Sequence, residues 1–471
     1  MFCVNCLKQP AAMIRFTHAS VFEHDPRTLF AWHERPGALE RLAPLWAPVH
    51  IENAEGIREG CRTVVRLGWG PLSTRCVALH TAYDEGKLFE DEQESGPFTS
   101  WRHRHRFEPH GKGRCRLVDD IELEPPLGDV GEMLGAGCLQ SNLEELFSYR
   151  HRVLANDLSL HRKYRTRPLT VAITGSSGLL GSALSAFLTT GGHRVLRLVR
   201  RAPRLETDIA WSPKEGRVET EKLEGVDAVV HLAGENLFAP RWSEAKKRRI
   251  YDSRIESTKL ISEVIARLKN PPSVLISSSA IGIYGDRGAE PLTEASEIDA
   301  DSFLARLCAD WEAAAQSARE AGVRTVHPRT GIVLSGAGGA LAPMLPFFKV
   351  GLGGRFGIPE AYLSWISLDD VLGVFYHAMH TPEIDGALNL TTPEPVTWNE
   401  FAPAMGDVLH RPTFVTVPPW LIRLASGEVA EDVILPSARV IPAVLQRTGY
   451  DFLFPNLRQA LRHQLGRSRT G

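Results

Sequence analysis

The sequence predicts an α/β protein in two parts, an N-terminal α+β unit followed by a larger, doubly wound parallel sheet. Strand-like segments separated by glycine-containing turns run through 14–125, and a helical pattern follows Pro125-Pro126. From Leu169 onward, short apolar strands alternate with amphipathic helices, an order typical of parallel sheets with helical crossovers. The length of 471 residues also favours more than one domain.

The composition excludes several classes of protein. Apolar residues make up 43% of the chain and charged residues 23%, as in ordinary globular proteins. The 54 Lys and Arg residues nearly balance the 56 Asp and Glu residues, so the net charge does not favour nucleic acid as a partner. No apolar run approaches the ~18 residues of a membrane span. Seven scattered cysteines indicate a reducing compartment, and we expect a cytoplasmic protein.

The first 12 residues read as a leader without regular structure. Cys3 and Cys6 form a C-x-x-C pair, but no second pair of ligands follows at the spacing of a structural zinc site. We therefore expect no metal site in the chain. Because the strand pattern begins after Met13, residues 1–12 are alternatively an extension ahead of the true start.

The segment Thr99–Phe107 alternates two chemically distinct faces, as a β-strand does. Trp101, His103, His105 and Phe107 share one face, whereas Arg102, Arg104 and Arg106 share the other. The arginine face could contact a phosphate backbone. The alternative, a solvated arginine face behind a cavity-lining face, is favoured because the rest of the chain is not basic.

A long amphipathic helix follows the predicted strands and ends near Tyr164, before a polar linker at 162–168. Apolar residues recur along it every three to four positions: Leu139, Leu143, Leu146, Phe147, Val153, Leu154 and Leu158. This order, together with FTHASVFEHDPRTLFAWHERPGALERLAPLW and FEDEQESGPFTSWRHRHRFEP, resembles the SRPBCC (START-like) domains. The resemblance implies a helix-grip fold over 13–165 that encloses a hydrophobic ligand. His103 and His105 would then be polar groups of the cavity or structural histidines.

A glycine-rich turn joins the apolar run LTVAIT to a helical segment. It reads Gly175-Ser-Ser-Gly178-Leu-Leu-Gly181, and a second strand, 195–199, follows the helix. Such a turn lets a pyrophosphate approach the backbone at a helix N-terminus. The predicted cofactor-binding residues here are Gly175, Ser177, Gly178, Leu179, Leu180 and Gly181. At the end of the second strand stand Arg200 and Arg201, which suit the 2′-phosphate of NADP(H).

Later segments continue the alternation. The strand within 226–236 (VDAVVHLAGEN) ends at Leu232, Ala233 and Gly234, which we expect to lie against the same cofactor. A further strand and loop occupy 273–286, and helices are predicted at 243–268 and 302–320. The segment 329–334 resembles a later strand of such a dinucleotide-binding sheet. The segment 364–370 resembles the loop on its substrate side.

Several motifs in order resemble the atypical "epimerase family" group of the short-chain dehydrogenase/reductase superfamily. They are HLAGEN, RWSEAKKRRIYDSRIESTKL, YGDRG, FLARLCADWEAAA and GGALAPMLPFFKVGLGG. The resemblance covers about 168–465, and it implies a Rossmann-type NADP-binding domain at 168–392 and a C-terminal lobe at 393–465. It also implies that Arg254 lies near the cofactor phosphates. An SRPBCC-like domain ahead of such a unit is an arrangement found in this family.

The superfamily's usual catalytic pair, Tyr-x-x-x-Lys on a helix, is absent where it is expected. The corresponding positions read Phe303 to Leu307, so neither the phenol nor the ammonium group is present. Ser279 and Tyr284, beside the expected nicotinamide position, are the catalytic candidates; alternatively they cap a strand and pack under the loop. Asp369 and Asp370 could act as acid/base groups, although their position favours a helix N-cap.

Three functions remain open on the sequence. The leading hypothesis is an NADP(H)-binding oxidoreductase or epimerase that acts on a small molecule, with a lipophilic substrate as one option. The alternative is a non-catalytic NADPH sensor, for example in cell division, which the missing Tyr-x-x-x-Lys pair favours. A third hypothesis, RNA binding, rests only on the arginine face of 99–107.

Overall fold

A computed structural model of the chain describes residues 13–68, 70–126, 128–164, 167–237, 241–299 and 301–467, with the backbone alone at 128–136 and 138. The predicted leader, 1–12, lies outside the described residues, as do Cys3 and Cys6. The chain divides into two compact units, with the boundary between Ser159 and Leu160. The predicted domain boundaries at 165–168 and 392–393 stay predictions.

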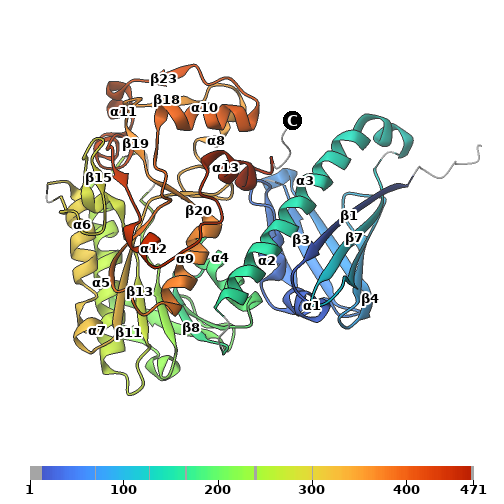
Figure 1. Cartoon of the computed structure of the whole chain (residues 1–471), viewed down its shortest axis with the longest axis horizontal. Helices are drawn as coiled ribbons and strands as arrows, with labels where there is room; N and C mark the ends of the chain where they lie inside the picture. Colours follow the sequence, from blue (N-terminus) through green and yellow to red (C-terminus); the bar gives the residue numbers. More distant parts are fainter. Residues whose placement is uncertain are drawn as a thin grey trace, which may run out of the picture. The chain divides into compact units, whose positions relative to one another are not determined.

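The first unit contains a seven-stranded antiparallel sheet within the described residues (Figure 1). Its spatial order is β1-β7-β6-β5-β4-β3-β2, so most neighbours are joined by hairpins. The strands are β1 (Ile14–Phe22), β2 (Val49–Ala54), β3 (Arg62–Leu67), β4 (Thr74–Asp84), β5 (Leu88–Ser95), β6 (Ser100–Pro109) and β7 (Cys115–Glu124). The predicted strand-rich segment is therefore confirmed as an antiparallel sheet.

Three helices accompany this sheet: α1 (Pro26–Glu34), α2 (Ala38–Leu42) and α3 (Gly128–Lys163). The α1 helix begins where Asp25 accepts a hydrogen bond from the Thr28 N–H at 3.0 Å. The predicted apolar stripe of α3 buries Leu143 and Phe147 against residues of β1 and β7, and Leu154 against Phe107 of β6 and the helix α1. A long helix on an antiparallel sheet thus forms the core of this unit.

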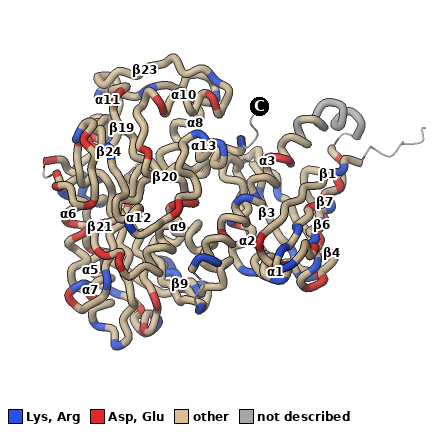
Figure 2. Tube along the Cα trace, in the orientation of Figure 1, with Lys and Arg blue, Asp and Glu red and all other residues tan. Residues whose placement is uncertain are grey.

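The two faces of β6 differ as predicted. His103, His105 and Phe107 are buried, and the arginines of the other face pair with carboxylates. Arg102 and Arg104 lie 2.9 and 2.7 Å from the two oxygens of Glu90. Figure 2 shows acidic and basic positions interspersed on these strands. This charge balance favours a solvated face and weakens the RNA-binding hypothesis.

The second unit contains a mainly parallel sheet of nine strands in the described part of the chain. Its order is β11-β10-β9-β8-β12-β13-β16-β14, with β21 paired to β16, and only β10 and β11 run antiparallel. The strands are β8 (Thr170–Thr174), β9 (Arg194–Val199), β10 (Asp208–Ser212), β11 (Arg217–Val218), β12 (Ala228–His231), β13 (Val274–Ser277), β14 (Ser279–Ala280), β16 (Arg324–Thr330) and β21 (Gly386–Leu390). The strand order reverses at β8, which creates a crevice at its carboxyl end.

Helices cover both faces of this sheet, which confirms the predicted Rossmann-like, doubly wound arrangement (Figure 1). One face packs against α4 (Leu179–Thr190) and α9 (Leu368–His380), and the other against α5 (Glu244–Arg267) and α7 (Gln316–Glu320). The predicted helix at 302–320 is observed as α6 (Phe303–Ala313) followed by α7.

The rest of the second unit consists of shorter helices and strand pairs, and part of it packs around Trp365, Phe401 and Leu461. Its elements are β15 (Pro291–Leu292), β17 (Ile332–Leu334), α8 (Leu345–Lys349), β18 (Gly354–Phe356), β19 (Tyr362–Leu363), β20 (Trp365–Ser367), β22 (Val396–Thr397), α10 (Trp398–Leu409), β23 (Val415–Val417), α11 (Pro419–Ser426), β24 (Arg439–Val440), α12 (Ala443–Arg447) and α13 (Leu457–Leu465). None of the helices in the described ranges combines the length and the apolar character that a membrane span requires.

The N-cap expected at Asp369 and Asp370 is instead Ser367, whose Oγ accepts a hydrogen bond from the Asp370 N–H at 3.0 Å. The aspartates lie in the first turn of α9 and are buried. Asp370 accepts hydrogen bonds from the N–H groups of Leu453 and Phe454, and burial raises its pKa to about 6. This carboxylate therefore anchors the C-terminal segment rather than facing a substrate.

The buried ion pair between Arg41 and Asp157 generates a test of stability. Arg41 donates to both oxygens of Asp157 at 2.8 and 2.6 Å, and both side chains are at most 5% exposed. We expect Asp157→Asn to lower the free energy of opening of α2 and the C-terminal part of α3 by roughly 3 kcal/mol, because the buried Arg41 loses the negative charge of Asp157. Hydrogen–deuterium exchange of the full chain measures this change.

The matched control is Glu94→Gln, since Glu94 also binds an arginine, Arg62, through both oxygens but is 45% exposed. Its effect should stay below about 1 kcal/mol. Equal effects of the two substitutions would contradict the importance of burial at Asp157.

Candidate functional site

The glycine-rich turn after β8 leaves the start of α4 open. Gly175 has a φ of +66°, and a Cβ atom there would lie 2.7 Å from the carbonyl oxygen of Leu232. A Cβ on Gly181 would lie 2.3 Å from the carbonyl oxygen of Gly175. Gly178 caps α4 without a side chain and is exposed, as is Ser177. The first N–H groups of α4, which have no acceptor within the helix, are therefore accessible to an anion.

The hydroxyl of Thr174 holds the ends of β8 and β12 together. It accepts hydrogen bonds from the N–H groups of Leu232 and Ala233 at 3.0 and 3.1 Å, and it lies 2.9 Å from Nδ1 of His231. Burial lowers the pKa of His231 to about 3, so its ring is neutral. Its Nδ1 accepts a hydrogen bond from the Thr174 hydroxyl. The predicted residues Gly175, Leu232 and Ala233 thus meet in one place.

Arg254 of α5 lies beside the same loop. A Cβ added to Gly234 would lie 3.1 Å from the guanidinium carbon of Arg254. The guanidinium is 5.0 Å from the ring centre of Trp311 and donates to the Ile250 carbonyl at 3.1 Å. Arg254 is only 7% exposed, and no carboxylate of the described residues lies within 4.0 Å of it. A buried cation without an anionic partner favours an anionic ligand.

The two predicted phosphate-binding arginines have different partners. Arg201 lies 2.9 Å from Asp208, which also accepts hydrogen bonds from Arg197 and from the Arg204 N–H. Although burial alone would raise the pKa of Asp208, these donors hold it at about 2. Arg200 is exposed and, within the described ranges, has neither an ion pair nor a side-chain hydrogen bond. Arg200 is therefore the guanidinium available to a ligand.

The helix α6 has no proton-transfer pair at the expected positions. Its N-cap is Ser302, whose hydroxyl accepts a hydrogen bond from the Ala305 N–H. Phe303 packs on Trp242, with ring centres 5.6 Å apart, and Leu307 is buried. These apolar positions give α6 a packing role.

Ser279 and Tyr284 are buried in a hydrogen-bond network. The Ser279 hydroxyl donates to Glu312 at 2.7 Å, and Arg329 binds both oxygens of Glu312 at 2.9 Å. Arg329 also donates to the Tyr284 hydroxyl at 2.9 Å, and that hydroxyl donates to Asn389 at 2.7 Å. Burial raises the pKa of Tyr284. Their catalytic role stays a prediction, while these contacts account for both hydroxyls.

Sequence reasoning missed Glu312, Arg329 and Asn389. Glu312 lies in the motif FLARLCADWEAAA and Arg329 in the segment 329–334, but only the contact across elements shows their pairing. A cavity of about 570 Å³ lies nearby, lined by residues that include Gly282, Gly285, Asp299, Ser302 and Asp432. Its polar and acidic lining suits a small molecule that carries hydroxyl groups.

Three family models match the chain. Residues 171–335 match the NAD dependent epimerase/dehydratase family, whereas 56–158 and 417–464 match two domains of unknown function. The first unit's match therefore does not show the expected SRPBCC relationship.

Relatives and solved structures agree with the match of the second unit. An epimerase family protein of Mycobacterium bovis is 43% identical over 291 residues, which are 62% of this chain and 96% of that protein. The structure of a nucleoside-diphosphate sugar epimerase from Corynebacterium glutamicum superposes with a TM-score of 0.79 at 33% identity, over 96% of this chain and 90% of that one.

The human epimerase family protein SDR39U1, whose structure contains NADPH, is also similar. It has a TM-score of 0.57 and 30% identity, over 63% of this chain and 99% of that one. These similarities extend over nearly the full length of each relative. The chain therefore belongs to the epimerase family.

Proposed function

We propose that the second unit binds NADP(H) and that the chain is an oxidoreductase or epimerase acting on a small molecule. One observation carries this proposal: the open N-terminus of α4 lies beside a loop held against Arg254, a buried cation without a described carboxylate partner. Helix N–H groups and a desolvated guanidinium both favour a pyrophosphate. The NADPH present in the human relative's structure supports this assignment.

Each predicted cofactor residue has a proposed role. The backbone from Gly175 to Gly181 would receive the pyrophosphate, and Leu232 to Gly234 would lie along the dinucleotide. Arg254 would neutralise a phosphate, and Arg200 would bind the 2′-phosphate. Arg201 supports this site indirectly, since its pair with Asp208 fixes the segment that follows β9. When bound, the nicotinamide would supply the hydride chemistry.

The chain's own residues would position a substrate rather than shuttle a proton through the usual pair. Ser279 and Tyr284 are tied by Glu312, Arg329 and Asn389, so this network would hold the loop after β13 rigid. The cavity bordered by Gly282 and Ser302 is the proposed recess for the substrate.

The second candidate function is a non-catalytic NADPH sensor. Phe303 and Leu307 favour it, because neither side chain can transfer a proton at this position of α6. In that case occupancy by NADPH would shift the chain between conformations or partners.

We also propose that the first unit is an SRPBCC-like domain that binds a hydrophobic molecule. Its long helix packed on an antiparallel sheet supports this assignment. The proposed domains are 13–165, 168–392 and 393–465, and a cytoplasmic location is proposed from the cysteine content.

Substitution of Arg200 tests cofactor preference. We expect the wild-type chain to bind NADPH more tightly than NADH, and Arg200→Ala to weaken NADPH binding by roughly tenfold or more, since a charge-assisted hydrogen bond is lost. NADH binding should change little. Fluorescence titration with each dinucleotide measures both affinities.

Two further variants make this test specific. Arg201→Ala should affect NADPH less, because Arg201 already pairs with Asp208. The control Arg194→Ala lies at the opposite end of β9 and should have no effect. Equal wild-type affinities for NADPH and NADH would overturn the assignment.

Gly181→Ala tests the turn itself. The new Cβ would lie 2.3 Å from a backbone oxygen, so the turn must shift. We expect NADPH affinity to fall by roughly tenfold and the thermal unfolding temperature to drop. Gly137→Ala in α3 is the control, because a Cβ there would meet no atom within 4 Å. Equal losses in both variants would contradict this role of Gly181.

Turnover separates the two candidate functions. We expect a carbonyl compound from a metabolite library to accelerate the oxidation of bound NADPH, followed by stopped-flow fluorescence. The variants Ser279→Ala and Tyr284→Phe should lower kcat if the loop after β13 orients the substrate. Tight NADPH binding with no turnover, unchanged by either substitution, would instead support the sensor.

A further inference from the structure

A cluster of histidine and aspartate side chains is buried in the first unit, where the ring of His103 also contacts Phe147 of α3. The buried members are His33, His80, His103, His105, His151 and Asp119. The rings of His103 and His105 lie 3.8 Å apart, and His105 stacks on Phe89 at 4.1 Å. Buried imidazoles need hydrogen-bond partners or another ligand, so each ring nitrogen in this cluster requires an explanation.

Asp119 of β7 accounts for part of the cluster. Its Oδ1 accepts a hydrogen bond from Nε2 of His103 at 3.0 Å, and its Oδ2 from Nε2 of His151 at 2.6 Å. Nδ1 of His151 accepts a hydrogen bond from the Ser20 hydroxyl at 2.8 Å. Asp119 therefore holds two rings by their Nε2 atoms and favours the Nε2–H tautomer of each.

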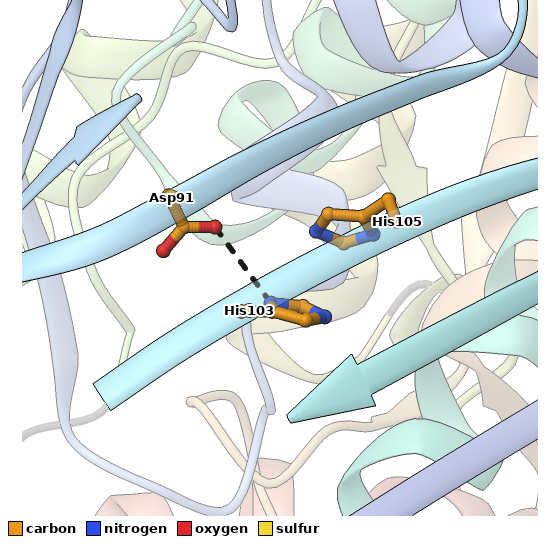
Figure 3. Close-up of side chains that lie close together, drawn as sticks. All are labelled: Asp91, His103 and His105. Atoms are coloured by element: carbon orange, nitrogen blue, oxygen red, sulfur yellow. Dashed lines mark ion pairs between the residues drawn. The ribbon is translucent and has the colours of Figure 1, made fainter. Parts of the chain in front are cut away.

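His103 then presents its other nitrogen to Asp91. These residues are directly opposite each other in the register of β5 and β6. Nδ1 of His103 lies 3.8 Å from Oδ2 of Asp91, too far for a hydrogen bond (Figure 3). In the neutral ring with the proton on Nε2, the lone pair of Nδ1 faces the Asp91 carboxylate. Two acceptors in this arrangement leave room for a cation between them.

His105 completes the group from the same strand as His103. Its Nδ1 lies 2.6 Å from Asp119 but makes no aligned hydrogen bond. Asp91, His103 and His105 offer ligand atoms that lie within 4.8 Å of one another. Figure 3 shows both imidazole rings on the side of the Asp91 carboxylate.

We propose that Asp91, His103 and His105 bind one divalent transition-metal ion, of the Zn²⁺ or Fe²⁺ class. Two imidazoles and one carboxylate are a ligand set typical of these ions and leave further coordination positions open. Metal–ligand bonds of about 2.1 Å place two ligands of one ion roughly 3–4 Å apart, which matches the separation of Asp91 and His103. Asp119 orients His103 from the outer shell.

The charges around the group are compatible with a cation. Asp91 and Asp119 supply two negative charges, and Arg150 of α3 supplies one positive charge close to both. Arg150 also donates to the Leu42 carbonyl at 3.2 Å. One negative charge is therefore not balanced by Arg150. Ligand spacing along the chain predicts no metal site here, because these ligands come from two neighbouring strands.

Metal titration of the full-length chain, prepared without a polyhistidine tag and treated with a chelator, tests this proposal. We expect Zn²⁺ to bind at one ion per chain by calorimetry and Co²⁺ to give visible ligand-field absorption. His105→Gln and Asp91→Asn should abolish both signals. Asp119→Asn should weaken binding by roughly 10–100-fold, because Asp119 only orients a ligand.

His110→Gln, at an exposed histidine in the turn between β6 and β7, is the matched control and should bind metal like the wild type. Circular dichroism identifies variants that fail to fold. If Asp91→Asn fails to fold, His105→Gln alone tests the loss of metal binding. Absence of stoichiometric Zn²⁺, Co²⁺ or Fe²⁺ binding by the folded wild-type chain would overturn the proposal. Equal binding by folded His105→Gln and His110→Gln would also overturn it.

Discussion

The second unit depends on the close approach of the backbone at the carboxyl ends of β8 and β12. A Cβ atom on Gly175 would lie 2.7 Å from the Leu232 carbonyl oxygen. The Thr174 hydroxyl accepts hydrogen bonds from the N–H groups of Leu232 and Ala233. Because β8 also pairs with β9, this contact brings three strand ends to one edge. The open start of α4 and Arg254 lie along that edge, so the contact creates the candidate dinucleotide site.

Buried carboxylates determine which arginines remain available. Asp208 and Glu312 are each bound by guanidinium groups, and the arginines that bind them are committed to structure. Arg200 and Arg254 lack such partners among the described residues, although Arg254 is as buried as Arg329. A buried guanidinium without a carboxylate partner favours the binding of an anionic ligand. Charge pairing thus distinguishes the arginines that remain available to a ligand from those committed to carboxylates more sharply than their position after a strand does.

The sequence was sufficient to predict the order of the elements and the position of the glycine-rich turn, whose role in phosphate binding stays a prediction. Hydrophobic periodicity and glycine spacing are local, and they specify the parallel sheet and the residues Gly175 to Gly181 directly. Pairing between distant residues is not local. The bond of Arg201 to Asp208, the network of Ser279 with Glu312 and Arg329, and the cap at Ser367 required the folded chain. The fold therefore distinguishes Arg200 from Arg201, which the sequence alone treats alike.

The first unit contains two kinds of buried polar group, a fully paired one and a partly paired one. Arg41 and Asp157 satisfy each other through two hydrogen bonds, which is the usual solution for a structural pair. Nδ1 of His105 lies 2.6 Å from Asp119 without an aligned hydrogen bond, and Nδ1 of His103 lies 3.8 Å from Asp91, too far for a hydrogen bond. A partly satisfied polar network destabilises a core more than an apolar one would, so its retention requires a compensating ligand. A cation that takes up these lone pairs would convert this destabilising group into a stabilising one.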